Sequence, residues 1–83
     1  MTKVIWKYPI HTRLEIPNSF IVRGVGIDGR RNPAMWIEVE TNNIPDICTF
    51  TVTCTGDPIP EGDVQYLGHF VVDDFVGHVW WLK

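Results

Sequence analysis

The sequence lacks the long apolar runs and the helical spacing that would place the chain in a membrane or a helical bundle. No apolar stretch approaches the roughly 18–20 residues needed to span a bilayer. The opening segment, MTKVIWKYPI, holds one short apolar patch interrupted by Lys7 and Pro9, unlike a secretory signal. No long segment combines a helical period with helix caps. We therefore expect a soluble, cytoplasmic protein with little or no helix and no membrane partner.

Residues that serve nucleophilic catalysis are also scarce. Ser19 is the only serine, and it lies in a turn-forming cluster rather than a nucleophile elbow. The Gly24-Val25-Gly26 segment lacks the third glycine and the following helix of a phosphate-binding loop. Glu38 and Glu40 have the residue type of a glycosidase pair, but alternating glutamates are more typical of the solvent face of a strand. We expect no catalytic site, and the protein is predicted not to be an enzyme.

The two cysteines, Cys48 and Cys54, are six residues apart. On a strand they would share one face at a separation of about 20 Å. A disulfide needs Cα atoms within roughly 7 Å, so these two cannot bridge each other there. We expect two small buried side chains in a reducing compartment, without a redox role.

A weak metal-site pattern is formed by His69, Asp73, Asp74 and His78. On two paired strands the histidines could lie opposite each other across the acidic turn, and two histidines with a carboxylate are a minimal zinc site. Acidic pairs at hairpin tips are usually solvated, however, and strand histidines are usually structural. We therefore predict no metal and no cofactor.

Positive charge is limited to seven lysines and arginines against ten acidic residues, which gives a net charge of -3. The cations are scattered, and Arg30-Arg31 is the one local pair. Duplex DNA binding normally requires a basic surplus on one face, so it is disfavoured.

What the 83 residues do contain is an alternation of apolar and polar side chains with a period of two. This pattern predicts six strands, at residues 3–10, 20–27, 34–40, 48–55, 64–72 and 75–82. Residues 11–19 are expected to be a connection. Asp28-Gly29 favours a type I′ hairpin turn, in a loop that residues 30–33 are expected to lengthen. We predict a single all-β domain over residues 1–83, with a curved antiparallel sheet closing into a small barrel or a two-layer sandwich.

The faces of these strands carry further expectations. In the strand at 48–55, Cys48, Phe50, Val52 and Cys54 are predicted to face inward and four threonines outward. Gly24 and Gly26 share one strand face, which indicates a bulge, a sharp bend, or the close approach of another backbone or a ring.

Apolar residues occupy both faces of the last two strands, so either a second layer or a second copy must cover them. The protein is accordingly predicted to form a homo-oligomer.

Candidate binding residues are those that combine an interface-prone type with an expected exposed position. Trp36 and Glu38 lie on the polar face of their strand, and Arg30 and Arg31 at a hairpin tip. Since Trp80 and Trp81 must face opposite sides, one indole points outward, and Trp81 is included as the candidate. Tryptophan and arginine are enriched in protein interfaces. The alternatives are an aromatic second core within one chain and, against the acidic balance, base stacking on single-stranded nucleic acid.

Four motifs in order complete the sequence analysis: Ile5-Trp6-Lys7-Tyr8, Thr55-Gly56-Asp57-Pro58-Ile59, Tyr66-Leu67-Gly68-His69-Phe70 and His78-Val79. With them the chain resembles, over nearly its full length, a family of small uncharacterised proteins of tailed bacteriophages and prophages. The family often has histidine where this sequence has Asp57, so a shared catalytic or metal-binding role of that loop does not follow.

The resemblance implies expression in the cytoplasm of an infected bacterium and no established reaction. We expect a non-enzymatic phage accessory protein that binds a host bacterial protein, including a component of a defence system. The first alternative is an oligomer that sequesters a small ligand or nucleotide, with Arg30 and Arg31 on phosphates and a tryptophan on the base. The second is a minor virion or structural protein.

Overall fold

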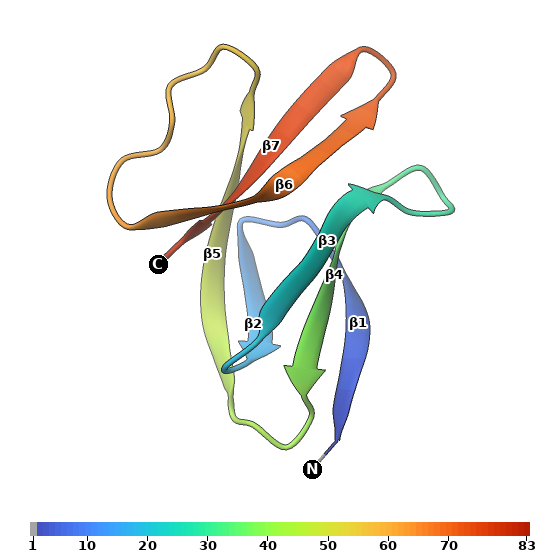
Figure 1. Ribbon diagram of the computed structural model, residues 1–83, viewed down its shortest axis with the longest axis vertical. Coiled ribbons are helices and arrows are strands. Elements are labelled where there is room, and N and C mark those ends of the chain that lie inside the picture. Colours follow the sequence, from blue (N-terminus) through green and yellow to red (C-terminus); the bar gives the residue numbers. More distant parts are fainter. Residues whose placement is uncertain (1) are drawn as a thin grey trace.

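A computed structural model describes residues 2–83 as seven β-strands joined by turns and loops (Figure 1). The strands are β1 (Lys3–Pro9), β2 (Arg13–Pro17), β3 (Ile21–Ile27), β4 (Pro33–Glu40), β5 (Pro45–Cys54), β6 (Val64–Val72) and β7 (Phe75–Leu82). Residues 2–83 contain no helix that could cross a membrane. The predicted all-β class is confirmed, with one strand more than expected.

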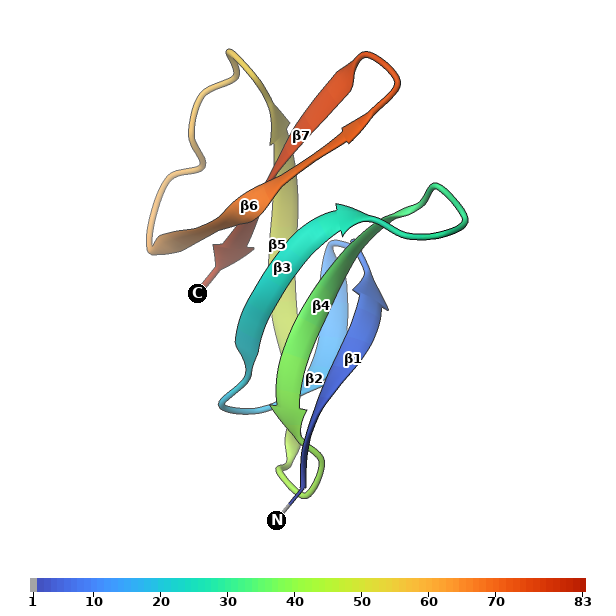
Figure 2. The same ribbon diagram turned by 45° about the vertical axis from the view of Figure 1, so that its right-hand side comes forward.

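The strands form two antiparallel sheets that face each other as the layers of a sandwich (Figure 2). Sheet A has the order β1-β4-β3, and sheet B has the order β2-β5-β7-β6. The layers also meet along one side, where β3 packs against β6. The sheets do not close into a barrel, so the structure adopts the sandwich of the two predicted arrangements.

The additional strand, β2, lies in the segment that the sequence analysis assigned to a connection. Its register pairs Leu14 with Cys48 and Ile16 with Asp46 of β5. Ile16 is completely buried. The connection prediction was wrong because this strand is short and bounded by polar residues and Pro17, so only two inward apolar positions mark it.

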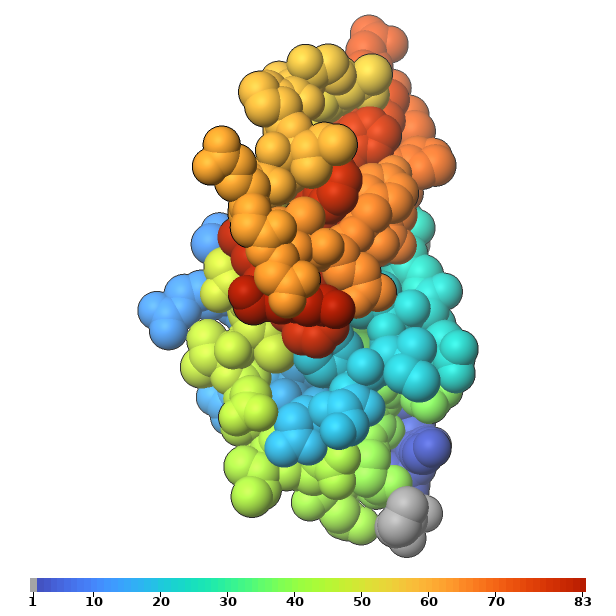
Figure 3. Space-filling view, turned by 60° about the vertical axis from the view of Figure 1, so that its left-hand side comes forward, coloured from blue at the N-terminus to red at the C-terminus, as the bar shows by residue number. Residues whose placement is uncertain are grey.

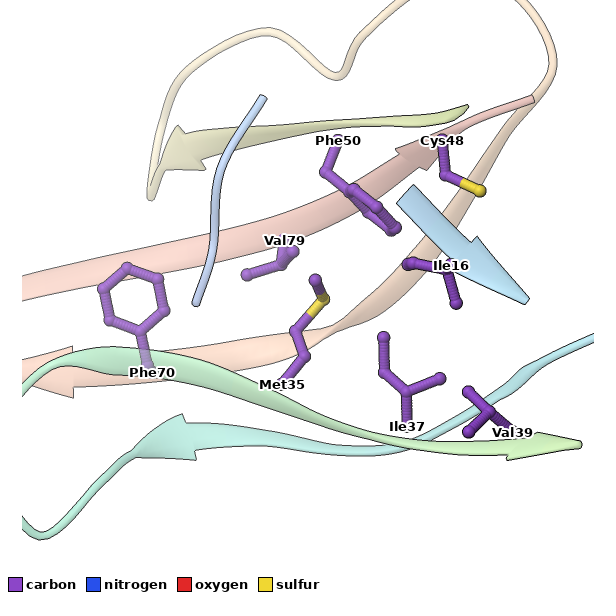
Figure 4. Packing of buried hydrophobic residues seen from close by; sticks show 8 residues of the cluster. All are labelled: Ile16, Met35, Ile37, Val39, Cys48, Phe50, Phe70 and Val79. Atoms are coloured by element: carbon purple, nitrogen blue, oxygen red, sulfur yellow. The ribbon is translucent and has the colours of Figure 1, made fainter. Parts of the chain in front are cut away.

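The core forms where the inner faces of the two sheets meet (Figure 4). Met35, Ile37 and Val39 alternate along β4 on the face opposite Trp36 and Glu38, and they are at most 1% exposed. Sheet B contributes Ile16, Cys48, Phe50, Phe70 and Val79. Burial of each large apolar side chain contributes about 1.5–3 kcal/mol, and this interlayer cluster is therefore the main source of stability.

Sheet A does not cover the whole inner face of sheet B. Cys48 and Phe50 are buried as predicted, whereas Val52 and Cys54 on the same face of β5 are exposed. The prediction for these two residues was wrong because alternation identifies a face but not how far the opposite layer extends. Both cysteines are free, as the spacing argument required.

The loop between β3 and β4 differs from the expected type I′ turn. Neither Asp28 nor Gly29 has positive φ; that conformation falls on Arg31, at 65°. Asp28 Oδ1 instead accepts hydrogen bonds from the backbone N–H groups of Arg30 and Asn32, at 2.8 and 2.9 Å. The loop is therefore longer, as expected, but the aspartate side chain organises it in place of a type I′ turn.

Candidate functional site

The outward surface of sheet A brings together two of the predicted binding residues, Trp36 and Glu38. The strand register places Ile5 of β1 and Ile21 of β3 on either side of Glu38. Ile5 is 58% exposed and Ile21 46% exposed. We call Ile5, Ile21, Arg23, Trp36 and Glu38 the sheet A surface.

Arg23 enters this surface through a bulge. The pairing of β3 with β4 shifts between Val22 and Gly24, as the two glycines predicted. The Arg23 guanidinium donates two hydrogen bonds to Glu38 Oε1, at 2.8 and 3.1 Å. Because this ion pair lies between the two isoleucines, the middle of the surface carries no net charge.

Trp36 packs closely on the neighbouring strand. It lies opposite Lys7 on one side and Gly24 on the other. Trp36 Cζ3 lies 3.6 Å from the position that a Cβ atom at Gly26 would take, an ordinary van der Waals distance, so the indole packs over this part of β3. A partly exposed tryptophan held against the backbone loses little conformational entropy on binding, which suits an interface anchor.

The sequence analysis placed Glu38 and Glu40 together on the solvent face of their strand, but Glu40 is buried. It is 8% exposed, and its Oε1 accepts a hydrogen bond of 2.8 Å from the Thr2 N–H. The carboxylate therefore ties the start of the chain to the end of β4. A glycosidase-like pair with Glu38 is not formed, because only one of the two carboxylates is accessible.

The charges of the molecule are divided unequally between its layers. Sheet A and its β3–β4 loop hold five cations and three acidic residues, a net charge of +2. These are Lys3, Lys7, Arg23, Arg30 and Arg31 with Asp28, Glu38 and Glu40. The remainder of the chain holds two cations and seven acidic residues, a net charge of -5.

Arg30 and Arg31 lie at the tip of the β3–β4 hairpin but point to different environments. Arg31 forms an exposed ion pair of 2.9 Å with Asp73, at the tip of the β6–β7 hairpin. Arg30 lines a depression of about 620 Å³ together with Lys7 and His11. The two arginines therefore do not form a single site with Trp36.

Trp81 and Trp80 occupy opposite faces of sheet B, as predicted, but Trp81 is not the outward ring. It pairs with Phe50 and packs against Phe20 with 4.8 Å between ring centroids. It lines a mainly apolar groove of about 590 Å³, which opens between the C-terminal end of β7 (dark red), the start of β5 (yellow-green) and the β2–β3 turn (light blue) in Figure 3. Trp80 is the outward indole, and its Nε1–H donates to Thr53 Oγ1.

The outward face of sheet B holds the two histidines considered as metal ligands. His69 and His78 pair across the strands with 6.1 Å between ring centroids. His78 Nδ1 lies 2.9 Å from the Tyr66 hydroxyl, and Nε2 lies 2.8 Å from Thr55 Oγ1. In residues 2–83 no group of three potential metal ligands is found. Both nitrogens of His78 already have hydrogen-bond partners, which supports its structural interpretation.

Burial raises the pKa of the Cys48 thiol, and the nearby Asp46 carboxylate adds to the effect. The pKa of Tyr8 is also raised, mainly by burial and then by the charge of Cys48. A raised pKa leaves less thiolate at neutral pH, so Cys48 is a poor nucleophile.

The sequence analysis missed several exposed apolar residues, above all Trp6. This side chain lies on the inward face of β1, opposite Ile37, yet is 45% exposed. It remains exposed because β1 is at the edge of sheet A. Pro9 was the available signal, since proline is confined to edge strands and bulges.

Comparison with known proteins gives one family. A family model covers residues 1–83, and its description is "Domain of unknown function (DUF7352)". No curated protein and no solved structure matches the chain significantly.

Proposed function

The chain belongs to the DUF7352 family, and on the basis of its surface we propose that it acts without catalysis, by binding a bacterial protein with an acidic docking face. The observation that carries the proposal is the sheet A surface itself. Exposed isoleucines, a packed tryptophan and an arginine occur together on a three-stranded sheet. An apolar centre with aromatic and arginine side chains is the composition of an interface core.

The charge distribution indicates the chemistry of the partner. The sheet A surface belongs to the layer with a net charge of +2, in a molecule whose net charge is -3. An acidic partner would be attracted to this layer and repelled by the other, which orients the encounter. We therefore assign the partner an acidic rim around an apolar patch.

The class of partner follows from the resemblance to small proteins of tailed bacteriophages. A host bacterial protein, including a component of a defence system, is the target we propose. A protein of the virion with the same acidic rim and apolar patch would also fit this surface. Capture of such a protein would replace the host protein as the proposed target.

The test is capture of a partner from infected and uninfected cells, followed by calorimetry with the identified, purified protein. Trp36→Ala is expected to weaken binding by about 30-fold, since a central anchor contributes about 2 kcal/mol. Ile21→Glu is expected to weaken it further by adding a charge that repels an acidic face. Ile47→Glu is the matched control, because Ile47 is 55% exposed but lies in sheet B.

Added salt should weaken the wild-type complex if the rim of the partner is acidic. Equal affinity of wild type, Trp36→Ala and Ile21→Glu would contradict the proposal. So would loss of binding with Ile47→Glu alone.

Nucleotide sequestration is the second candidate, favoured by the depression that Lys7, His11 and Arg30 line. These residues can offer positive charge to phosphate. Lys7 is, however, paired with Asp28, with 3.1 Å between Nζ and Oδ2. Among residues 2–83, no tryptophan lines the depression. A nucleotide that binds wild type but not Arg30→Ala would support this candidate over the first.

A further inference from the structure

The free edge of β1 is flanked by exposed apolar side chains, whereas β3 and β6, which end the two sheets on another side, pack against each other. β1 is the terminal strand of sheet A, and β4 is its one neighbour in that sheet. Ile5 on one face and Trp6 on the other are both exposed. We propose that two copies of this chain pair through antiparallel β1 strands, with Trp6 of one copy opposite Trp6 of the other. This inference is independent of the proposed function.

The register with β4 shows which backbone groups of β1 are free. The Thr41 N–H donates to the Thr2 carbonyl at 3.0 Å, and the pairing of Lys3 with Glu40 continues in register from this point. In an antiparallel ladder, hydrogen-bonded pairs alternate along the strand. The backbone groups of Val4 and Trp6 therefore point toward β4.

It follows that Lys3, Ile5 and Lys7 direct their N–H and C=O groups away from the sheet. Pro9 offers a carbonyl there but no N–H, so it ends the free edge without blocking its middle. Three successive outward residues are sufficient for a regular antiparallel ladder with a second strand.

The side chains select one register among those that this backbone allows. Pairing centred on Ile5 places Lys3 opposite Lys7 of the second copy, and pairing centred on Lys7 places two Lys7 residues opposite each other. Like charges directly opposite are destabilising. Pairing centred on Trp6 avoids both contacts, because Ile5 then lies opposite Lys7. It also joins the whole of β1, Lys3–Pro9, whereas pairing centred on Val4 would leave the end of the strand unpaired.

The Trp6 register also pairs groups that suit each other. The two indoles occupy a position without backbone hydrogen bonds, where cross-strand side chains are closest. Val4 lies opposite Tyr8 of the second copy. The ammonium of Lys7 lies 3.1 Å from Asp28 of its own chain, so Ile5 meets mainly the aliphatic part of the lysine.

The result is a continuous six-stranded sheet with a twofold axis through its centre. A closed twofold contact uses the same strand in both copies and leaves no further β1 edge for growth. The lysines and Pro9, which commonly protect sheet edges, then limit pairing to this register rather than prevent it.

The register is tested by cross-linking in a Cys54→Ser background, which removes the exposed thiol. Under mild oxidation Trp6→Cys should form a covalent dimer, because its Cβ atoms would lie about 4.5–5.5 Å apart, near the distance of a disulfide. Ile5→Cys is the matched control and should not cross-link, since it would face Lys7. Efficient cross-linking of Ile5→Cys instead would overturn the proposed register.

The assembly itself is tested by light scattering of wild type and Ile5→Pro over about a hundredfold range of concentration, because self-association depends on concentration. Wild type should reach twice the mass of one chain. Ile5→Pro removes an N–H that points away from β4 and should be a folded monomer by circular dichroism. A monomeric wild type, or a dimer that persists in Ile5→Pro, would overturn the proposal. Cross-linking still tests the register if the proline variant fails to fold.

Discussion

At the residue scale, Asp28 shows how a single carboxylate determines the conformation of a loop. The N–H groups of Asn32 and Arg30, together with Lys7, hold the pKa of Asp28 below its ordinary value. They do so because they stabilise the charged form. The loop of the β3–β4 hairpin therefore depends on the ionised carboxylate.

Asp28→Ala is expected to lower the urea midpoint at neutral pH. Because the folded-state pKa is depressed, the stabilisation is complete above the unfolded value of about 4 and is lost as the pH falls through the folded value. The difference between wild type and variant should therefore close in acid. Asp74→Ala, at the other hairpin tip, is the control. A difference that stays constant with pH would contradict the assigned role.

Gly77 illustrates a different restriction at the residue scale, that of space. A Cβ atom there would overlap the Phe70 ring and lie 2.9 Å from Phe75 Cε2. Gly77→Ala should destabilise the fold by about 1–3 kcal/mol, the usual cost of overpacking. Gly29→Ala, where nothing lies within 4 Å, should change stability little. Equal urea midpoints for the two variants would refute this explanation.

At the element scale, the strands that the sequence predicted are those with a sustained two-residue period. The inward face of β4 was predictable because Met35, Ile37 and Val39 alternate without interruption. β2 was not, because its five residues offer only two inward positions. The exposure of Trp6 depends on the strand order β1-β4-β3, for which Pro9 was the one local signal.

The importance of β2 can be measured by Ile16→Ala. Ile16 is fully buried between the layers, so its truncation should reduce the free energy of unfolding by about 2–5 kcal/mol. Ile47→Ala, on the paired strand but 55% exposed, should lie within about 0.5 kcal/mol of wild type. Chemical denaturation measures both. A small effect at Ile16 would mean that β2 is not part of the stabilising core.

At the scale of the whole molecule, the two layers differ in charge as well as in strand number. Sheet A with its loop has a net charge of +2 and the remainder of the chain -5. A negatively charged surface should therefore attract sheet A with its loop, and a positively charged surface should attract the remainder of the molecule.

At neutral pH and low salt, wild type is expected to be retained on a cation exchanger despite its net charge of -3. Lys3→Glu combined with Lys7→Glu should abolish retention. Arg13→Glu combined with Lys83→Glu makes the same change of net charge outside sheet A. This variant should be retained more strongly than the Lys3, Lys7 variant. Similar elution of both double variants would show that total charge, rather than its distribution, governs retention.

The chain crosses from one sheet to the other three times, between β1 and β2, between β2 and β3, and between β4 and β5. This order has a consequence for biosynthesis. β2 leaves the ribosome before β5, its only neighbour in sheet B, has been translated. Sheet A can pair its strands first, but its inner face has no complete covering until the C-terminal half emerges. Such distant pairings favour folding over milliseconds to seconds rather than microseconds. A nascent chain stalled after β4 should accordingly be sensitive to proteases, and resistance should appear only once β7 is free of the exit tunnel.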